Sequence, residues 1–102
     1  NGAKEIHLRV ACPPLMYPCI YGSSTRTKGE LAARRAIRTL CGKDPESIAP
    51  YLNAKSRAYR EMVEWIRNDL NVTSLKYLTI DEMIEAIGLP EKDLCLYCWR
   101  GC

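Results

Sequence analysis

One short alternating segment near the start of the chain constrains its fold more than any other feature. Between Ile6 and Val10, apolar residues alternate with His7 and Arg9, which is the period of a half-buried β-strand. A strand needs neighbours to pair with, and the rest of the chain offers one further short candidate, at residues 75–78. We therefore interpret the chain as a fragment of a larger α/β protein, or as a chain that completes its sheet with a partner.

A loop rich in proline and cysteine follows this strand, at residues 12–19. Proline lacks the amide hydrogen that a sheet needs, and it biases the preceding residue towards extended geometry. The loop is therefore expected at the carboxyl end of the strand, which is the edge where ligands bind to open α/β sheets.

Most of the remaining chain is expected to be helical. The first predicted helix begins at a capping box formed by Thr27 and Glu30 and ends before Gly42. The second begins at Asp44, which is a favoured N-cap residue, with Pro45 at the first helical position.

Two further helices are predicted in the second half of the chain. The longest covers residues 55–70, where apolar residues follow the 3.6-residue period of an α-helix. The last opens with a capping box of Thr79 and Glu82 and stops at Gly88. The expected fold class is thus a predominantly α-helical α/β fragment, with one strand followed by about four helices and a cysteine-rich tail.

The composition is that of a small globular domain. The chain has 102 residues, of which 47% are hydrophobic and 26% are charged, and this size suits one domain. No apolar run approaches the ~20 residues that a membrane-spanning helix needs, so we expect no membrane partner. The formal net charge of +3 is too small to indicate a nucleic-acid partner.

Basic residues gather along the first predicted helix. We interpret them as a solvated helix face, with Glu30 pairing with Arg34 one turn later, rather than as a nucleic-acid footprint. The stretch consists of Arg26, Lys28, Arg34, Arg35 and Arg38.

Six cysteines are the main chemical feature of the chain. They allow a metal or cluster site, a disulfide framework, or thiols without a common role. Cys95 and Cys98 form a C-x2-C motif, in which two thiolates can bind one metal ion or two irons of a cubane cluster. The sequence has no second such pair, so a site of four thiolates has to draw on distant residues. The other cysteines are Cys12, Cys19, Cys41 and Cys102.

Four other conspicuous residues have structural interpretations. His7 is interpreted as a hydrogen-bonded structural histidine on the polar face of the strand. Cys41 continues an apolar helix face and is expected to be a buried free thiol. Trp65 and Trp99 are expected to pack in the interior.

Five blocks of sequence together resemble a known enzyme family. They lie at residues 2–10, 11–19, 73–78, 85–90 and 95–99, and the last of them reads CLYCW. In these blocks and their order, the chain resembles the C-terminal part of the glutamine phosphoribosylpyrophosphate amidotransferases, also called amidophosphoribosyltransferases. The resemblance covers essentially the whole chain.

The resemblance implies a two-step reaction in the parent enzyme, at the first committed step of purine nucleotide synthesis. A glutaminase domain releases ammonia from glutamine. A type I phosphoribosyltransferase domain then uses ammonia and Mg²⁺ to displace pyrophosphate from phosphoribosylpyrophosphate, which gives 5-phosphoribosylamine. By the same resemblance, residues 1–22 are the last part of the phosphoribosyltransferase core, including one strand of its sheet. Residues 23–102 are a C-terminal helical region.

The resemblance also implies a metal site. In the branch of the family that carries a cluster, the cysteines that match Cys19, Cys95 and Cys98 ligate a [4Fe-4S] centre with a structural or regulatory role. The family's remaining ligand lies upstream of the matched segment. The resemblance assigns no catalytic residue and no further cofactor-binding residue to this chain.

The expected partners follow from the fragment interpretation. The chain lacks the family's N-terminal cysteine nucleophile and its acidic phosphate-binding loop, so the isolated chain is expected to be inactive. Its implied partner is the remainder of the parent enzyme, which is expected to be a cytoplasmic homo-oligomer. The alternative is a small, non-enzymatic module that binds a metal or a nucleic acid.

Overall fold

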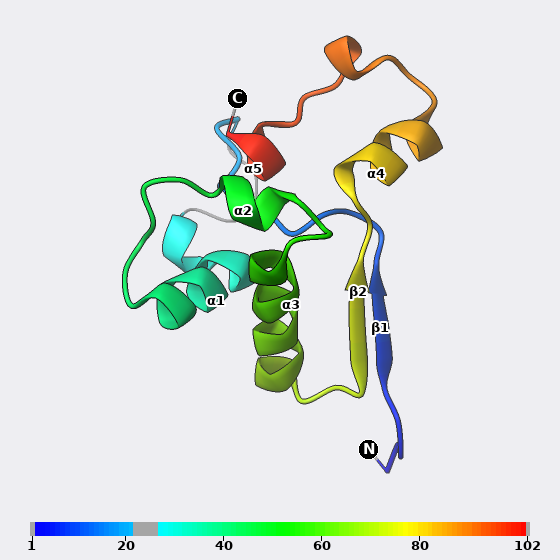
Figure 1. The fold of residues 1–102 in the computed structure, drawn as a ribbon. Coiled ribbons are helices and arrows are strands. Elements are labelled where there is room, and N and C mark those ends of the chain that lie inside the picture. Colours follow the sequence, from blue (N-terminus) through cyan, green and yellow to red (C-terminus); the bar gives the residue numbers. More distant parts are fainter. Residues whose placement is uncertain (1, 22–26, 102) are drawn as a thin grey trace.

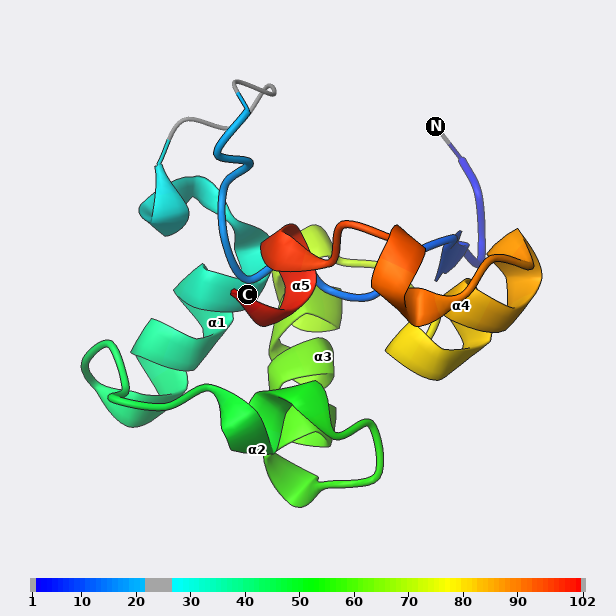
Figure 2. The same cartoon turned by 90° about the horizontal axis from the view of Figure 1, so that it is seen from above.

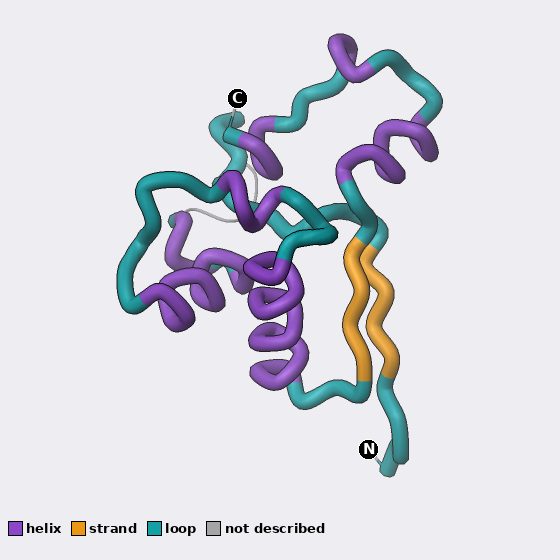
Figure 3. Tube along the Cα trace, viewed as in Figure 1, coloured by secondary structure: helices purple, strands orange, loops and turns teal. Residues whose placement is uncertain are grey.

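Two short strands and a set of helices make up the chain (Figures 1 and 3). The computed structural model describes residues 2–21 and 27–101. In chain order the elements are β1 (His7–Val10), the 3-10 helix η1 (Lys28–Glu30), α1 (Ala32–Cys41), α2 (Ala49–Leu52), α3 (Arg57–Leu70), β2 (Ser74–Tyr77), α4 (Ile80–Ile87), the 3-10 helix η2 (Glu91–Asp93) and α5 (Tyr97–Arg100).

The sheet consists of β1 and β2, which run parallel with His7 opposite Ser74 and Val10 opposite Tyr77. Both strands were expected from the sequence, and both are confirmed within one residue of the predicted bounds. Leu8 and Leu75 lie in register on the face that packs against the core. Parallel strands need a long crossover between them, and here α1, α2 and α3 provide it.

The core lies where α1 and the sheet meet the two sides of α3. In Figure 1, α3 stands between α1 and β2, and it packs against both. Its buried residues Met62 and Ile66 are 0% and 1% exposed, and Ile37 of α1 is also fully buried. Met16, from the loop after β1, is 1% exposed and belongs to the same cluster. The loop is therefore anchored in the core close to its midpoint.

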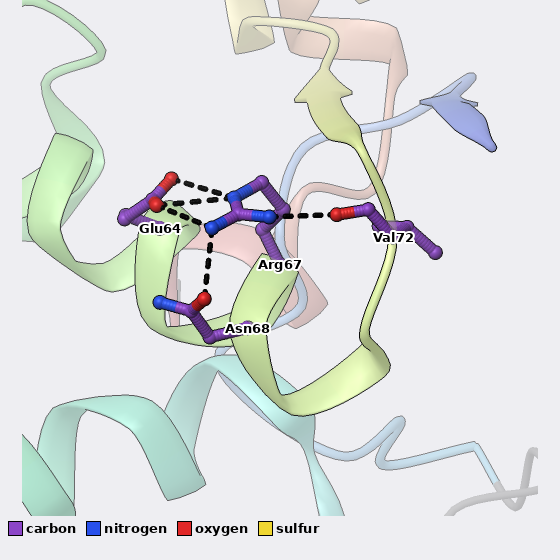
Figure 4. A network of polar contacts seen from close by, with 4 residues as sticks. All are labelled: Glu64, Arg67, Asn68 and Val72. Carbon is purple, nitrogen blue, oxygen red and sulfur yellow. Dashed lines mark hydrogen bonds and ion pairs between the residues drawn. The ribbon is translucent and has the colours of Figure 1, made fainter. Parts of the chain in front are cut away.

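The end of α3 is fixed by one arginine (Figure 4). The Arg67 guanidinium forms two-pronged contacts with the Glu64 carboxylate, with Nη2 to Oε1 at 2.7 Å, and Nη1 donates to the Val72 carbonyl at 2.7 Å. The pairing lowers the pKa of Glu64 from its ordinary value. Asn71 closes the helix with a left-handed φ of 55°. These contacts turn the chain from α3 directly into β2.

Helix boundaries with strong local signals lie where they were expected. The capping box of α4 is confirmed, because Thr79 Oγ1 accepts from Glu82 N at 3.1 Å and Glu82 Oε1 accepts from Thr79 N at 3.0 Å. Gly88 ends that helix with a left-handed backbone. Ser56 caps α3, which was predicted from residue 55.

The predicted start of the first helix is wrong. Thr27 makes no side-chain cap hydrogen bond, and only the short η1 follows it. Leu31 then adopts an extended backbone, with φ −72° and ψ 130°, and α1 begins at Ala32. Leu31 is buried at 6% exposure. The buried, extended Leu31 thus separates η1 from α1. The predicted capping box of Thr27 and Glu30 gave no indication of this break.

The predicted start of the second helix is also wrong. Residues 43–48 are not helical, and α2 begins at Ala49 with Pro50 in its first turn. Asp44 pairs with Arg38 of α1 at 3.6 Å instead of capping a helix. The short helix α5, over Tyr97–Arg100, was not predicted at all. In the described part of the chain, no helix has both the length and the apolar character to cross a bilayer.

Candidate thiol site between the loop after β1 and α5

The loop after β1 meets the last helix of the chain. The amides of Met16 and Tyr17 both donate to the Cys98 carbonyl, at 2.8 and 2.9 Å. In Figures 1 and 2 the blue loop and the red helix α5 lie side by side. Two backbone hydrogen bonds to one oxygen fix the loop against the C-x2-C motif, although the two segments stand near opposite ends of the sequence.

The thiol of Cys98 lies at this contact and interacts with two other cysteines. Burial raises the pKa of the Cys98 thiol, and the charge and hydrogen bond of the Cys19 thiol and the charge of Cys95 raise it further. Cys19 Sγ also accepts from the Tyr21 amide at 3.4 Å. None of the described cysteines forms a disulfide. Cys19 is therefore a hydrogen-bond partner of Cys98, whereas Cys95 acts on it only through its charge.

These thiols do not enclose a ready-made site for a single ion. Across residues 2–21 and 27–101, no group of three or more cysteine, histidine, aspartate or glutamate side chains is arranged to hold a metal ion. In a cubane cluster each thiolate binds a different iron, so its ligands need not surround one point. The donor set, three sulfurs from two segments with apolar Leu96 buried between two of them in sequence, fits a cluster better than a lone ion.

Aromatic stacking also joins the two segments. The rings of Tyr17 and Tyr97 have centroids 5.6 Å apart and are tilted by 43°, a favourable geometry for an aromatic pair. Gly101 lies directly against Tyr17, since a Cβ built there would stand 2.6 Å from Cε2 of that ring. The tail therefore approaches the tyrosine at a position that only a glycine allows.

Arg34 is the residue at this site that the sequence interpretation placed wrongly. It was expected on a solvated helix face with Glu30 as its partner, and this is wrong, because Arg34 is 2% exposed and forms no ion pair within the described residues. Its Nε donates to the Met16 carbonyl at 2.7 Å, and its guanidinium lies 4.7 Å from the centre of the Tyr17 ring. The available signal was its helical spacing. Arg34 lies three residues before Ile37, which places both side chains on the buried face of α1.

The other described residues of the basic stretch, Lys28, Arg35 and Arg38, are exposed. Arg35 pairs with Asp69 at 3.3 Å and Arg38 pairs with Asp44 at 3.6 Å. Arg26 lies outside the described residues.

The remaining cysteines stand apart from the thiol site or outside the described chain. Burial raises the pKa of the Tyr77 phenol, and the charge of the nearby Cys12 thiol raises it further. Cys41 was expected to be buried, and this is wrong, because it is exposed and its Sγ lies 2.8 Å from the Tyr51 hydroxyl. It sits in the last turn of α1, where the helix face has already turned to solvent. Cys102 lies outside the described residues.

The outer face of the sheet carries a second polar cluster. His7 Nδ1 lies 2.7 Å from Ser74 Oγ, which also accepts from Arg9 Nη1 at 2.9 Å. His7 Nε2 lies 3.6 Å from a Glu5 carboxylate oxygen. The ring is thus hydrogen-bonded, as expected of a structural histidine, and it ties the two strands together across the face that the core does not cover.

The two tryptophans pack as expected. Trp65 lies against the core cluster, with the Arg35 guanidinium 5.8 Å from its ring. Trp99 lines a small cavity with Pro13, Pro14 and Tyr59. Its indole nitrogen is buried and has no hydrogen-bond partner in the described structure.

Sequence relatives define the class of protein to which this chain is similar. No protein-family profile matches it, and no solved structure does. Its curated relatives are transferases of the phosphoribosyl group. They are named amidophosphoribosyltransferase, and the one from Methanothermobacter thermautotrophicus is 38% identical over 100 residues, which is 98% of this chain and 16% of that protein. The resemblance predicted from the sequence blocks is confirmed.

The match extends over distant organisms. The amidophosphoribosyltransferase of Methanocaldococcus jannaschii is 34% identical over 98% of the chain, again covering 16% of that protein. The Drosophila melanogaster protein of the same name is 30% identical over 90% of the chain and 12% of its own length. The chain therefore spans about a sixth of the length of its first relatives.

Proposed function

We propose that this chain is the C-terminal segment of an amidophosphoribosyltransferase. The parent enzyme makes 5-phosphoribosylamine from phosphoribosylpyrophosphate and glutamine in de novo purine synthesis. The observation that carries this proposal is the identity of 38% across 98% of the chain with a protein of that name. On this proposal, β1 is one strand of the type I phosphoribosyltransferase sheet, and the boundary between core and helical region falls near residue 22.

The proposed role of this segment is structural rather than catalytic. The glutaminase nucleophile and the phosphate-binding loop, with its Mg²⁺, are supplied by the remainder of the parent enzyme, which we propose to be a cytoplasmic homo-oligomer. The loop after β1 lies at the carboxyl end of a parallel strand, the edge where such sheets bind ligands. The segment holds that loop in place through Met16 in the core and Cys98 in the tail.

We further propose that Cys19, Cys95 and Cys98 are ligands of a [4Fe-4S] cluster in the parent enzyme. The hydrogen bond between the Cys19 and Cys98 thiols and the charge effect of Cys95 support this proposal, and a fourth ligand would come from upstream. Cysteines bind metals as thiolates, so the raised pKa of Cys98 favours the protonated thiol until iron replaces its proton. A bound cluster would supply a covalent tie between the loop and the tail.

An activity assay of the complete polypeptide tests the enzyme assignment. It is expected to release glutamate and pyrophosphate only when glutamine, phosphoribosylpyrophosphate and Mg²⁺ are all present. The isolated 102-residue chain is expected to release neither above a control without protein. Metal binding by the complete polypeptide without this activity would instead support the non-enzymatic module.

Iron analysis tests the cluster assignment. After anaerobic reconstitution of the complete polypeptide, the variants Cys19→Ser, Cys95→Ser and Cys98→Ser are expected to lose bound iron and acid-labile sulfide. Cys41→Ser is the matched control, because its thiol contacts Tyr51 and not the thiol site. Equal iron content in all four variants and the parent would contradict the ligand assignment.

A further inference from the structure

The contacts of Arg34 point to a role beyond helix stability. We propose that Arg34, acting through Tyr17, is a positioning residue that holds Cys19 against Cys98 before any metal binds. The inference deepens the proposed function and rests on it only for the identity of the group that the thiols bind. The proximity of the thiols, which Arg34 controls, is a property of the chain itself.

The burial of Arg34 has a cost that its contacts must offset. A guanidinium taken out of water loses hydration, and this loss is usually offset by a carboxylate. Arg34 is 2% exposed, yet the described chain places no carboxylate within ion-pair distance of it. Its contacts go instead to Met16 and Tyr17, which are neighbours in one loop. The hydrogen bond to Met16 and the cation–π contact with Tyr17 are therefore the contacts that offset the cost of burying this charge, and both join α1 to the same loop.

The Met16 residue is held from both sides. Its amide donates to the Cys98 carbonyl at 2.8 Å, and its carbonyl accepts from Arg34 Nε at 2.7 Å. Its side chain is also buried in the core, at 1% exposure. Arg34 therefore fixes the orientation of the peptide plane that follows Met16, and that plane carries the second amide directed at Cys98, that of Tyr17.

A stack of three planar groups continues this connection to the tail. The Arg34 guanidinium lies 4.7 Å from the Tyr17 ring centre, and the Tyr17 ring lies 5.6 Å from that of Tyr97. Each contact is favourable, the first as a cation–π interaction and the second as an aromatic pair. The stack runs from α1 through the loop to α5, which carries Cys98.

The position of Cys19 follows from this arrangement. Only Pro18 separates Tyr17 from Cys19, and proline fixes φ near −65°. The direction of the chain leaving Tyr17 is thus passed on to Cys19 with little freedom. On the tail side, Tyr97 precedes Cys98 directly. When Arg34 no longer holds Tyr17, the position of Cys19 relative to Cys98 is therefore expected to become less well defined.

Arginine suits this role better than lysine. The guanidinium is flat, so it stacks on a ring while its Nε–H donates within its own plane to a carbonyl. A lysine ammonium can occupy the site as a charge but cannot make both contacts. Arg34→Lys is therefore expected to behave like a loss of the residue, which a role in charge balance alone does not predict.

The test measures how readily the two thiols pair in the metal-free complete polypeptide. Cys12, Cys41, Cys95 and Cys102 are replaced by serine, together with the glutaminase nucleophile and every other cysteine upstream of this segment, which leaves Cys19 and Cys98. The protein is equilibrated with reduced and oxidised glutathione. Each disulfide formed takes two electrons and two protons from the thiols and converts one oxidised glutathione into two reduced ones. The equilibrium ratio gives the effective concentration of one thiol at the other, and hence the reduction potential of the pair.

Arg34→Met and Arg34→Lys are both expected to lower this effective concentration about tenfold, the size of one lost hydrogen bond to a charged donor. Arg38→Met is the matched control, because Arg38 lies one turn along α1 but is exposed and pairs with Asp44. It is expected to stay within about twofold of the parent. Tyr17→Leu keeps Arg34 but removes the stack, and it is expected to act in the same direction as the Arg34 variants.

Two results would overturn the proposal. The first is an effective concentration within twofold of the parent in Arg34→Lys and Arg34→Met, with the circular dichroism of a folded chain. If the Arg34 variants unfold, Tyr17→Leu decides, and an unchanged value there overturns the proposal. Iron content separates this inference from the cluster assignment. Arg34-dependent pairing in a protein that never binds iron would retain the positioning role and reject the cluster.

Discussion

The interior around α3 and the thiol site beneath α5 are held together in different ways. The interior is apolar, and Ile37, Met62 and Ile66 are fully buried with contacts on every side. The thiol site depends on a few directional contacts, namely two backbone hydrogen bonds to Cys98, one buried arginine and a pair of tyrosine rings. The first arrangement tolerates small shifts in any one contact, whereas the second has few contacts to lose.

The two regions also differ in how far apart in the sequence their determining residues lie. The 3.6-residue period of α3 places its own apolar residues on one face, and this face packs in the interior. The thiol site joins a loop before α1 with a tail after α4, so its geometry depends on how the rest of the chain folds. Changes in the interior are therefore expected to cost stability throughout the chain, and changes at the thiol site are expected to separate two segments while the helices persist.

The largest effect is expected in the interior. Ile37→Ala removes a fully buried side chain and leaves a cavity between α1 and α3, which should lower the free energy of unfolding by about 2–5 kcal/mol. Leu40→Ala on the same helix is the control, because Leu40 is 45% exposed and its loss should cost less than ~1 kcal/mol. Urea unfolding followed by far-ultraviolet circular dichroism measures both. Similar costs at the two positions would show that α1 does not pack as described.

A smaller effect is expected at the thiol site. Gly101 and Gly88 both have left-handed backbones, with φ of 85° and 80°, but only Gly101 lies against another side chain, that of Tyr17. Each change to alanine should cost about 1 kcal/mol for the backbone. Gly101→Ala should cost about 1–3 kcal/mol more, because its methyl group would displace the Tyr17 ring.

A double-mutant cycle checks the cause of that excess. In a Tyr17→Ala background the ring is gone, so Gly101→Ala and Gly88→Ala should cost nearly the same. Their free energies of unfolding come from the same urea titrations. An excess at Gly101 that persists without the Tyr17 ring would mean that the tail is held by something else.

A third effect concerns α4, which depends on neither region. Thr79→Ala removes the cap from a backbone amide and should cost about 0.5–2 kcal/mol. Glu82 accepts from the Thr79 amide, and this holds its pKa below the ordinary value. The contribution of Glu82 is therefore present at neutral pH and is lost as the pH falls through its lowered pKa. The penalty of Glu82→Gln should be present at pH 7 and absent at pH 2.5, and a penalty that persists in acid would contradict the capping role.

Local signals predicted the regular parts of the fold. The alternation in residues 6–10 and the period of residues 55–70 were sufficient for β1 and α3, and the Thr79 capping box marked the start of α4. Each of these signals involves residues that contact one another within a few positions. The start of α1 was wrong because Leu31 is buried in an extended conformation, and no local rule contains that tertiary contact.

The candidate site was less accessible from the sequence. The C-x2-C motif named two of the thiols, and the resemblance to a family supplied Cys19 as the third. The role of Arg34 was interpreted in the wrong way, because helix-pairing rules assign an arginine to a glutamate four residues before it. What buried it was the loop of Met16 and Tyr17, which lies far from Arg34 in sequence. A residue whose partners come from another segment leaves no periodic signature.

The smallest expected effect concerns Cys41, which lies outside both regions. It tests whether the pairing of Cys19 with Cys98 is independent of changes at another cysteine. The Tyr51 hydroxyl lies 2.8 Å from Cys41 Sγ, and this hydrogen bond, with burial, raises the pKa of Tyr51 to about 12. Because the folded-state pKa lies above the unfolded value, the stabilisation is complete below pH 10 and is lost as the pH rises towards 12. Cys41→Ala should move the Tyr51 titration towards its ordinary value of about 10. Cys41→Ser keeps a hydroxyl partner and should move it less.

Ultraviolet absorbance of tyrosinate, recorded against Tyr51→Phe, isolates this titration. The pairing of Cys19 with Cys98 should be the same in Cys41→Ala as in the parent, because Cys41 contacts neither thiol segment in the described structure. A changed pairing equilibrium in this variant would mean that α1 transmits strain from its last turn, near Cys41, to Arg34. In that case the interior and the thiol site would be energetically coupled and not independent.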